Sequence, residues 1–575
     1  MTEPGLHPRV VEARREMEQG RMSRRSFVRL AALLGVSAGT AYAMAGLKAP
    51  AMAAAHGMST PFPADDPNAT AGGTLRIAMQ IQKMEDPATY SWTEMSNQTR
   101  HFLEHLTMTG PDNITRPMLA ETWIASDDLK TWTFKLRKGV VWHSGDPFTA
   151  DDVIFNFQRW MNPALGSSNV GLSTVAAMVE EVDTGKKDDK GNPVMEKRQI
   201  AGALEKVDDL TVRLNLSKPV LSVPEDLYNY PTALVHRSFT PPLSANPNGT
   251  GPFRLKENVV GERCILERVT RTDDGKDFTY WGGKVYLDGI NYYNFDEDNQ
   301  LTAFASGDVD SIYEFGIEQF ELAKALEDQG TILAAKTAQT LVCRFQITQK
   351  PFDDIRVRRA LTMAIDTAPF NDLVFQGLGT EAEHHHVAPI HPEYFPLPKL
   401  KRDVAGAKKL LAEAGYPDGI EVTIDVGNTD GPWHQTVCEI MRDQMADAGI
   451  RLNINVMPAS KYWEVWDKTP FGATAWTHRP LGTMVLSLGY RSGVPWNETH
   501  FASPEFDAAL DAAEATFDVE ERKAKMETVE KILQDAAVMI QPIYRPVFTI
   551  VAKRVHGYAA HPTQYHQYNK VWVES

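Results

Sequence analysis

Residues 113–160 read NITRPMLAETWIASDDLKTWTFKLRKGVVWHSGDPFTADDVIFNFQRW. Polar and apolar side chains alternate over residues 131–138, which is the period of a half-buried strand. Ser144-Gly145-Asp146-Pro147 is a turn sequence. Thr149 then stands where a helix N-cap belongs, with Asp151-Asp152 in the predicted first turn. These residues alone predict a strand, a turn and a helix in a protein that mixes α and β structure.

The identities of the residues in this stretch carry more information than their periodicity. The string LAETW…SDD…TWTFKLRKGV.WH.G.PFTADDV.F resembles the signature of the peptide/nickel class of extracytoplasmic solute-binding proteins (family 5), which feed ATP-driven importers. Further similar segments are residues 248–253 (NGTGPF), 288–310 and 351–366. The resemblance implies an α/β fold of two lobes with an extra inserted subdomain and a hinged ligand cleft between the lobes. We interpret His143 as part of the fold and the glycines of residues 248–253 as a backbone requirement.

The first 55 residues are predicted to be an export signal. Arg24 and Arg25 lie in a twin-arginine pattern, followed by an Ala/Gly-rich run over residues 30–47 and Ala-x-Ala processing signals. Cleavage is expected after Ala53 or Ala55. The alternative is a membrane anchor, but the run is poor in Leu and Ile, so its insertion energy is marginal. The implied partner during export is the twin-arginine translocase.

The chain contains three cysteines, Cys264, Cys343 and Cys438, and none lies near the expected cleavage site. A lipid anchor on a new N-terminal cysteine is therefore excluded. Three scattered cysteines form neither a metal motif nor a full disulfide framework, and we interpret them as small core residues. The predicted location is periplasmic, as a free and soluble protein.

Composition is that of an ordinary globular protein, with 43% hydrophobic and 23% charged residues. The formal net charge of -16 argues against nucleic acid or anionic lipid as a partner. The length exceeds the capacity of one hydrophobic core. The resemblance sets the expected division: signal 1–55, linker 56–72, lobe I 73–98 and 232–340, inserted subdomain 99–231, lobe II 341–539, and a return to lobe I over 540–575.

The second lobe also has a periodicity of its own. Asp403 can cap a helix that ends at Gly415, and residues 420–426 alternate as a strand. A second helix stopped by Gly449 and a second strand over residues 450–456 follow. This order predicts a parallel sheet covered by helices, whose ligand crevice lies at the carboxyl ends of the strands.

The next predicted strand, residues 472–476, ends at Trp476 and leads to Thr477, His478 and Arg479. In peptide binders of the resembled family, an aspartate that pairs with the peptide ammonium follows this tryptophan shortly. Here Arg479 stands in its place. A guanidinium forms bidentate hydrogen bonds with a carboxylate or phosphate, and it repels an ammonium group. We therefore hypothesise a ligand with an anionic or hydroxyl-rich group. The alternative is that Arg479 pairs with an internal acid such as Glu393 or Glu498.

Other candidate ligand contacts are weaker. The resemblance places the residues just after the first strand at the cleft. Trp496 could stack on a ligand and Asn497 could hydrogen-bond to one, but Trp496 is equally well explained as a side chain that covers the core. The three adjacent histidines of residues 384–386 are a poor metal site because neighbouring side chains point to opposite faces. One of them, represented by His385, is expected to have a structural or ligand-bonding role. The full set of predicted contacts is Met79, Gln80, Trp92, His385, Trp476, Thr477, His478, Arg479, Trp496 and Asn497.

No dinucleotide turn, cysteine cluster, nucleophile elbow or H-E-x-x-H motif occurs in the sequence. The predicted function is therefore a binding receptor without cofactor, a monomer that captures a peptide-like or other small polar solute and delivers it to an inner-membrane ABC permease. The alternatives are a receptor for a non-peptide anionic solute or a metal chelate, a signalling or chaperone role for the same cleft, and an exported enzyme.

Overall fold

The computed structural model describes residues 8–19, 21–22, 27, 61–91, 93–187 and 193–574. The chain separates into two units, Met1–Pro61 and Phe62–Ser575. In the first unit, α1 (Pro8–Glu18) is a helix of eleven residues. Arg24 and Arg25 of the predicted export signal lie outside the described residues. Over the described ranges, no helix has both the length and the apolar content that crossing a membrane requires.

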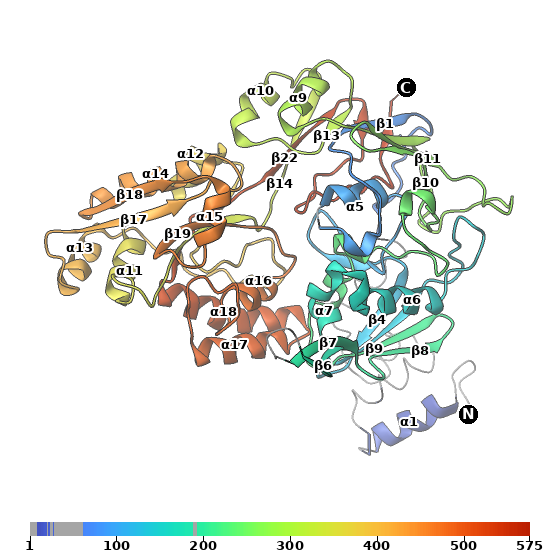
Figure 1. Cartoon of the computed structure of the whole chain (residues 1–575), viewed down its shortest axis with the longest axis horizontal. Helices are drawn as coiled ribbons and strands as arrows, with labels where there is room; N and C mark the ends of the chain where they lie inside the picture. The colour runs from blue at the N-terminus through green and yellow to red at the C-terminus, as the bar shows by residue number, and fades with distance from the viewer. Residues whose placement is uncertain are drawn as a thin grey trace. The chain divides into compact units, whose positions relative to one another are not determined.

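A seven-stranded sheet lies in the second unit, in the order β10-β11-β12-β1-β13-β22-β14 (Figure 1). Its central strand β1 runs parallel to both of its neighbours, β12 and β13. Leu75 and Ile77 of β1 are fully buried because alternate residues face one side of the sheet. The strands are β1 (Thr74–Ala78), β10 (Phe253–Val259), β11 (Arg263–Arg268), β12 (Gly289–Tyr293), β13 (Ser311–Ile312), β14 (Gly330–Ala335) and β22 (Val547–Ala552).

A second seven-stranded sheet has the order β16-β21-β15-β19-β17-β18, with β20 also paired to β15. Strand β17 is parallel to β18 and to β19. We call residues 340–544, which supply this sheet, lobe II, and the rest of Phe62–Ser575 lobe I. The strands are β15 (Thr340–Phe345), β16 (Thr380–Glu381), β17 (Ile420–Val426), β18 (Ile450–Val456), β19 (Phe471–Trp476), β20 (Met539–Ile540) and β21 (Ile543–Tyr544).

The β-α-β pattern predicted for lobe II is confirmed. The Asp403 carboxylate accepts a hydrogen bond from the Gly406 backbone at the start of α13 (Val404–Glu413). Helix α14 (Trp433–Ala446) follows β17 and packs on β17 and β18. The other helices of lobe II are α11 (Ile355–Met363), α12 (Ala368–Phe375), α15 (Ala459–Val465), α16 (Gly482–Gly489), α17 (Pro504–Glu514) and α18 (Val519–Ala536).

The end of lobe II differs from the boundary predicted at residue 540. Strand β21 pairs with β15 and β16 of the second sheet. Pairing with the first sheet resumes only at Val547, where β22 begins. The physical reason is that Thr340 at the start of β15 needs a partner on the side away from β19, and Tyr544 supplies it.

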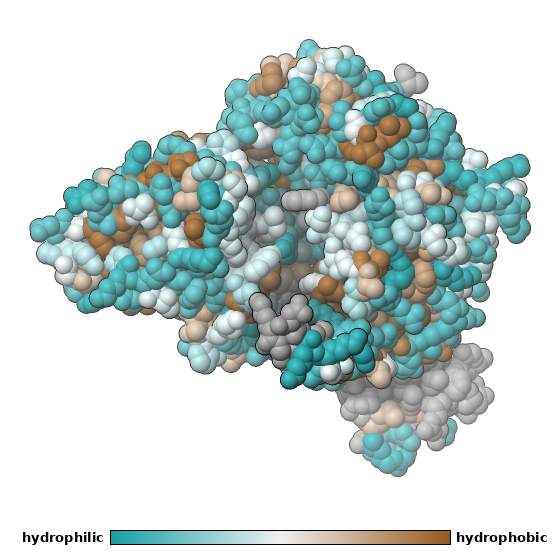
Figure 2. Space-filling model, viewed as in Figure 1, coloured by the Kyte–Doolittle hydropathy of each residue, from teal (hydrophilic) through white to brown (hydrophobic). Residues whose placement is uncertain are grey.

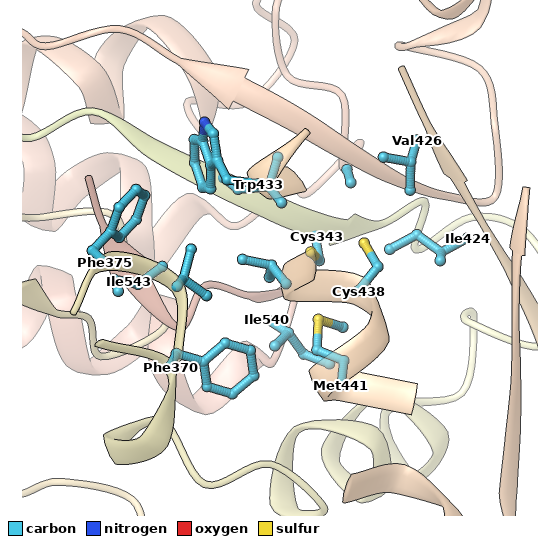
Figure 3. Packing of buried hydrophobic residues seen from close by; sticks show 14 of the residues in the cluster. Cys343, Phe370, Phe375, Ile424, Val426, Trp433, Cys438, Met441, Ile540 and Ile543 are labelled. Carbon is cyan, nitrogen blue, oxygen red and sulfur yellow. The ribbon is translucent and has the colours of Figure 1, made fainter. Parts of the chain in front are cut away.

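All three cysteines are free, buried and packed among apolar side chains, which confirms the interpretation from the sequence. Cys343 and Cys438 lie in the core of lobe II with Phe370, Trp433 and Met441 (Figure 3). Cys264 belongs to the core beneath the first sheet. The face of the molecule shown in Figure 2 is mostly hydrophilic, and apolar residues form small patches on it.

The stretch over residues 113–160 forms part of a smaller four-stranded sheet and a helix that packs on it. The sheet has the order β4 (Ala120–Ala125), β5 (Thr131–Leu136), β9 (Thr211–Asn215) and β8 (Leu204–Asp208), and the helix is α6 (Ala150–Met161). The predicted strand and helix are both present. Elsewhere in lobe I lie α5 (Thr93–Thr99), α7 (Ser173–Ala176), α8 (Val223–Asp226), α9 (Glu297–Ala305), α10 (Phe320–Lys324), β2 (Thr107–Thr109), β3 (Thr115–Pro117), β6 (Val179–Lys187), β7 (Pro193–Gln199), β23 (Val555–His556) and β24 (Trp572–Val573).

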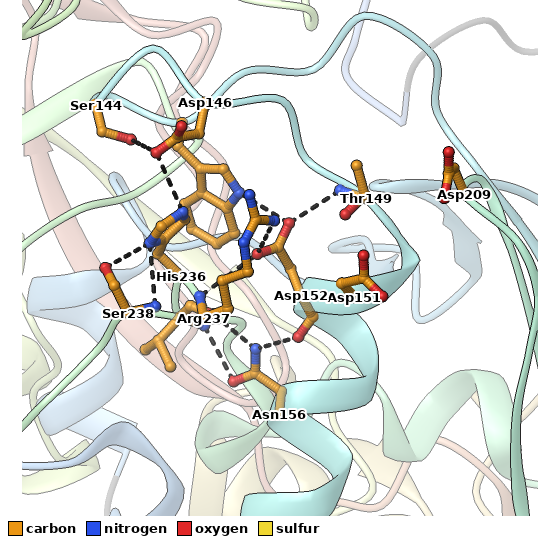
Figure 4. Close-up of polar contacts among 12 residues, drawn as sticks. Ser144, Asp146, Thr149, Asp151, Asp152, Asn156, Asp209, His236, Arg237 and Ser238 are labelled. Carbon is orange, nitrogen blue, oxygen red and sulfur yellow. Dashed lines mark hydrogen bonds and ion pairs between the residues drawn. The ribbon is translucent and has the colours of Figure 1, made fainter.

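One buried carboxylate holds the turn between β5 and α6 in place. Asp152 accepts hydrogen bonds from the Thr149 backbone at 2.9 Å and the Trp142 indole at 3.2 Å. Its other oxygen accepts one from Arg237 at 3.1 Å (Figure 4). His143 is buried, and its Nε2 donates to the Gly251 carbonyl at 2.8 Å. The WHSGDPFTADD string therefore has a structural role.

Among the glycines of residues 248–253, Gly249 has the least room for a side chain. A Cβ there would lie 1.9 Å from the carbonyl oxygen of Phe102, and neither backbone segment can yield cheaply. Gly249→Ala is expected to lower the free energy of unfolding by about 3 kcal/mol. Denaturant unfolding measures the change. The matched control is Gly171→Ala, where a Cβ meets no atom within 4 Å, and equal costs for the two variants would contradict the packing argument.

Candidate ligand cleft

Strand β19 delivers Trp476 and the three residues after it to the boundary between the lobes. His478 is buried, and its Nδ1 accepts a hydrogen bond from the Ala338 backbone at 3.0 Å. Its Nε2 therefore carries the proton and donates to Asn113 Oδ1 at 2.9 Å. Burial lowers the pKa of His478 well below its ordinary value, in agreement with this neutral form. His478 thus positions the two lobes and has no ring nitrogen left for a ligand.

Asn113 is a lobe-to-lobe contact that the sequence did not reveal. Its side-chain amide donates to the Pro480 carbonyl at 2.8 Å and to the Ile390 carbonyl at 3.2 Å, both in lobe II. Asn113 has a positive φ of 60°, which asparagine tolerates better than most residues. A groove with a volume of about 540 Å³ lies beside this contact, lined from both lobes by residues that include Asp112, Lys336, Thr337, Ile390 and Ala560.

Arg479 has no acidic partner among the described residues. One terminal nitrogen donates to Thr477 Oγ1 at 2.7 Å and to the His478 carbonyl at 3.1 Å. The side chain keeps partial contact with solvent, yet burial by surrounding protein lowers its pKa, while Tyr230 and Tyr565 of lobe I oppose that change. Solvent contact combined with desolvation is characteristic of a side chain in a narrow cleft.

The alternative that Arg479 pairs with Glu393 or Glu498 is wrong. Glu498 accepts hydrogen bonds from Arg344 and Trp476, and from the hydroxyl of Thr474. Glu393 accepts from the backbone and the hydroxyl of Thr483. Arg479 and the exposed Thr477 beside it are therefore the two predicted contacts of this strand end that remain open to a ligand.

Trp476 is only 7% exposed, and its indole N–H is used by Glu498 at 2.8 Å. It packs edge-on against His386 and Trp496, with ring centroids 5.3 and 6.1 Å away. Little of its ring is therefore free for stacking on a ligand. Trp496 is 47% exposed and offers the larger aromatic surface of the pair.

Two further residues predicted to contact a ligand, Asn497 and Met79, have their side chains engaged inside the protein. The Asn497 amide donates to the Phe501 and Arg491 carbonyls at 2.7 and 3.1 Å and accepts from the Thr499 hydroxyl, so it closes a turn. Met79 is fully buried in the core beneath the first sheet, because alternation along the chain turns it inward. Gln80 is half-buried, and Trp92 lies outside the described residues.

The His385 side chain is also hydrogen-bonded inside the protein. It is fully buried, its Nδ1 accepts from the Val387 backbone, and its Nε2 lies 3.0 Å from the Glu383 carboxylate. His384 and His386 bond to other partners, the Gln541 backbone and the Tyr490 hydroxyl. Within the described ranges no group of three His, Cys, Asp or Glu side chains is arranged to hold a metal ion. Both ring nitrogens of His385 therefore have partners inside the protein.

Glu530 next to His385 provides a test of this buried cluster. Burial raises the pKa of Glu530 to about 9, so the folded protein keeps a proton that the unfolded chain releases above about pH 4.5. Its contribution to stability is therefore present below that value and is lost as pH rises toward 9. Between about pH 5 and about pH 8, the free energy of unfolding of Glu530→Gln is expected to exceed that of wild type by a few kcal/mol.

Urea unfolding at several pH values measures this difference. The control is Glu520→Gln, whose carboxylate is 75% exposed, and it should follow the wild-type curve. Parallel pH profiles for Glu530→Gln and wild type would show that Glu530 is ionised in the folded protein.

Comparison with known proteins agrees with this geometry. The sequence model of the bacterial extracellular solute-binding proteins, family 5, matches residues 115–492. Heme-binding protein A of Haemophilus influenzae is 27% identical over 80% of this chain and 84% of its own. The periplasmic oligopeptide-binding protein OppA of Escherichia coli is 26% identical over 83% of this chain and 88% of its own. The solved structure of HbpA2 from Haemophilus parasuis superimposes with a TM-score of 0.72 at 23% identity, covering 88% of this chain and all of that one.

Because the family match spans more than half of the chain, the protein belongs to the family 5 extracellular solute-binding proteins. The fold is the two-lobed α/β fold of periplasmic binding proteins, as the sequence predicted. Its function is to bind a substrate, again as predicted, and the family consists of binding proteins.

Proposed function

We propose that this protein is the periplasmic receptor of an ABC importer and that its ligand is a small polar solute with an anionic group. The observation that carries the proposal is Arg479, which is partly exposed beside the lobe-to-lobe contact of His478 and has no acidic partner among the described residues. A guanidinium in a desolvated cleft favours carboxylate or phosphate and disfavours a free ammonium.

The relatives support receptor function and leave the ligand open. Their printed names include heme-, dipeptide- and oligopeptide-binding proteins. Arg479 argues against peptides held by a free amino terminus, and the internal hydrogen bonds of His385 give no support to a metal chelate. In this proposal the two lobes close on the solute, and the closed form docks on the membrane permease, where ATP hydrolysis drives release. No residue of this chain makes or breaks a bond.

The proposal includes how the protein reaches its location. Residues 1–55 act as a twin-arginine signal that is removed, and the mature protein is a free monomer without a lipid anchor. Cys264, Cys343 and Cys438 lie far along the chain and are buried, so none is available for acylation at a processed N-terminus. N-terminal sequencing of the secreted protein tests the signal, and sedimentation measures the oligomeric state.

Native mass spectrometry of the protein purified from the periplasm of its own host tests the ligand class. We expect a co-purified anionic solute that is lost on unfolding and rebinds after refolding. Deleting the gene should abolish uptake of that solute. A co-purified peptide bound by its free amine, or a metal lost on unfolding, would overturn the anionic assignment. Unimpaired uptake in the deletion strain would overturn the importer role.

A further inference from the structure

Arg100, like Arg479, has no acidic partner among the described residues. It follows α5 in a last helical turn and is 8% exposed. Its Nε donates to the Ser96 hydroxyl at 3.2 Å. Neither terminal nitrogen has solvent-exposed surface or a hydrogen bond of good geometry in the part of the chain that the structure describes, although the Tyr228 side chain interacts with the guanidinium. Buried charged donors are costly to leave unpaired, so a binding partner is the natural explanation for two of them on one side chain.

Two tyrosine rings cover Arg100 in place of an acid. The guanidinium carbon lies 3.6 Å from the ring centre of Tyr565 and 4.6 Å from that of Tyr228. Cation–π contacts offset part of the cost of burying the charge but leave the in-plane N–H groups unsatisfied. Burial raises the pKa of Tyr565 to about 12, although Arg100 opposes the change, so its hydroxyl is neutral. The Tyr228 hydroxyl accepts from Gln567 at 2.8 Å.

The polar groups around Arg100 do not neutralise it. Burial, with Arg100 adding to the effect, lowers the pKa of both His101 and His561, so these rings are uncharged near neutral pH. The nearby carboxylate of Glu104 is occupied by hydrogen bonds from Thr250, Tyr280 and Trp281. Arg100 therefore keeps a positive charge that no acidic group among the described residues neutralises.

Tyr565 is the residue common to Arg100 and Arg479. Its ring lies over Arg100 in lobe I, and its charge state affects the pKa of Arg479 in lobe II. The Asn97 side chain fixes the backbone on both sides of it, donating to the Gln564 carbonyl at 2.9 Å and accepting from the His566 backbone at 3.1 Å. The backbone that carries the Tyr565 ring is thus held in place, so the ring is the part of this residue that would have to move to uncover the guanidinium.

We propose that Arg100 is a second anion-binding residue, that Tyr565 covers it in the absence of ligand, and that the solute is a small dianion. This rests on the proposed function and narrows its substrate class. One acidic group of the solute binds Arg479 of lobe II, and the other displaces the Tyr565 ring and binds the terminal nitrogens of Arg100. A dianion held in this way neutralises both charges and joins the lobes, so binding favours the closed form.

Calorimetric titration of the purified mature protein with glutarate and with glycerol 3-phosphate tests the proposal, and acetate is the monoanion control. We expect wild type to bind one of the two dianions, which distinguishes carboxylate from phosphate, at least about tenfold more tightly than acetate. Arg100→Met should lose about tenfold or more in affinity for that dianion, and Arg100→Lys should recover part of it. Arg271→Met, at a side chain 71% exposed, should bind as wild type.

The stability of the ligand-free protein separates binding from a structural role. Because Arg100→Met removes an unpaired buried charge, its thermal midpoint without ligand should equal or exceed that of wild type. Tyr565→Ala should speed association with the dianion, because no ring has to be displaced. Unchanged dianion affinity in Arg100→Met, with Arg479→Ala impaired, would overturn the role of Arg100 and leave the proposed function standing. If wild type binds no dianion while its native ligand is neutral or cationic, both proposals fail.

Discussion

Replacing Arg344 by methionine is expected to lower the free energy of unfolding by about 3–5 kcal/mol. Arg344 is fully buried, and its Nε donates to Glu498 at 3.0 Å, while its terminal nitrogens bind the carbonyls of Thr469 and Trp466. Its removal leaves the Glu498 carboxylate buried without a counter-charge and frees two carbonyl groups. Chemical denaturation with a two-state fit measures the loss.

A double-mutant cycle identifies the cause of this loss. Glu498→Gln removes the charge and keeps one acceptor oxygen, which can still accept from the Trp476 indole. The combined Arg344→Met and Glu498→Gln variant should therefore be less destabilised than the sum of the single changes. Additive costs would show that the pair contributes packing and not charge compensation.

Arg479→Ala is expected to weaken binding of the native anionic solute by about 10- to 100-fold, because a charge-assisted hydrogen bond in the cleft is lost. Its free energy of unfolding should change little, since within the described residues the Arg479 side chain donates only to the adjacent Thr477 and His478. Arg479→Asp should do more, because an acid at this position repels the anion and attracts an ammonium. That variant is expected to gain affinity for dipeptides with a free amino terminus.

Calorimetry with the native solute and with a dipeptide measures both changes. The control is Arg451→Ala on strand β18, a side chain 74% exposed that lies 3.5 Å from Glu421. It should leave both affinities unaltered. Wild-type affinity in Arg479→Ala would remove the basis for an anionic ligand.

The local sequence pattern predicted the helices and strands of lobe II because capping and side-chain alternation depend on residues close together in the chain. The Asp403 cap and the alternation of residues 420–426 and 450–456 each depend on neighbours a few positions away. The resemblance of residues 113–160 added the family. That Arg479 stands where peptide binders of the family carry an aspartate could be seen in the sequence, whereas its lack of an acidic partner among the described residues could only be seen in the structure.

Whether a predicted site residue is already bonded inside the protein depends on contacts that no local pattern shows. Asn497 and His385 have side chains suited to a ligand, but Phe501 and Glu383 occupy them, and a sequence does not show which polar groups are already satisfied. Arg100 and Tyr565 lie 465 positions apart, and no periodicity joins them. The one signal was a basic residue in the apolar and aromatic surroundings of residues 100–106.

Strand β22 has a consequence for how the protein is made. It lies between β13 and β14, although its residues follow β14 by more than two hundred positions. A ribosome therefore finishes all of lobe II before the first sheet can be completed, and the nascent lobe I exposes an unpaired strand edge throughout that time. Lobe II can fold as it emerges, whereas lobe I waits for the last part of synthesis. Loss of the chain beyond Tyr544 would remove β22 and leave β13 and the edge strand β14 without the partner that they share.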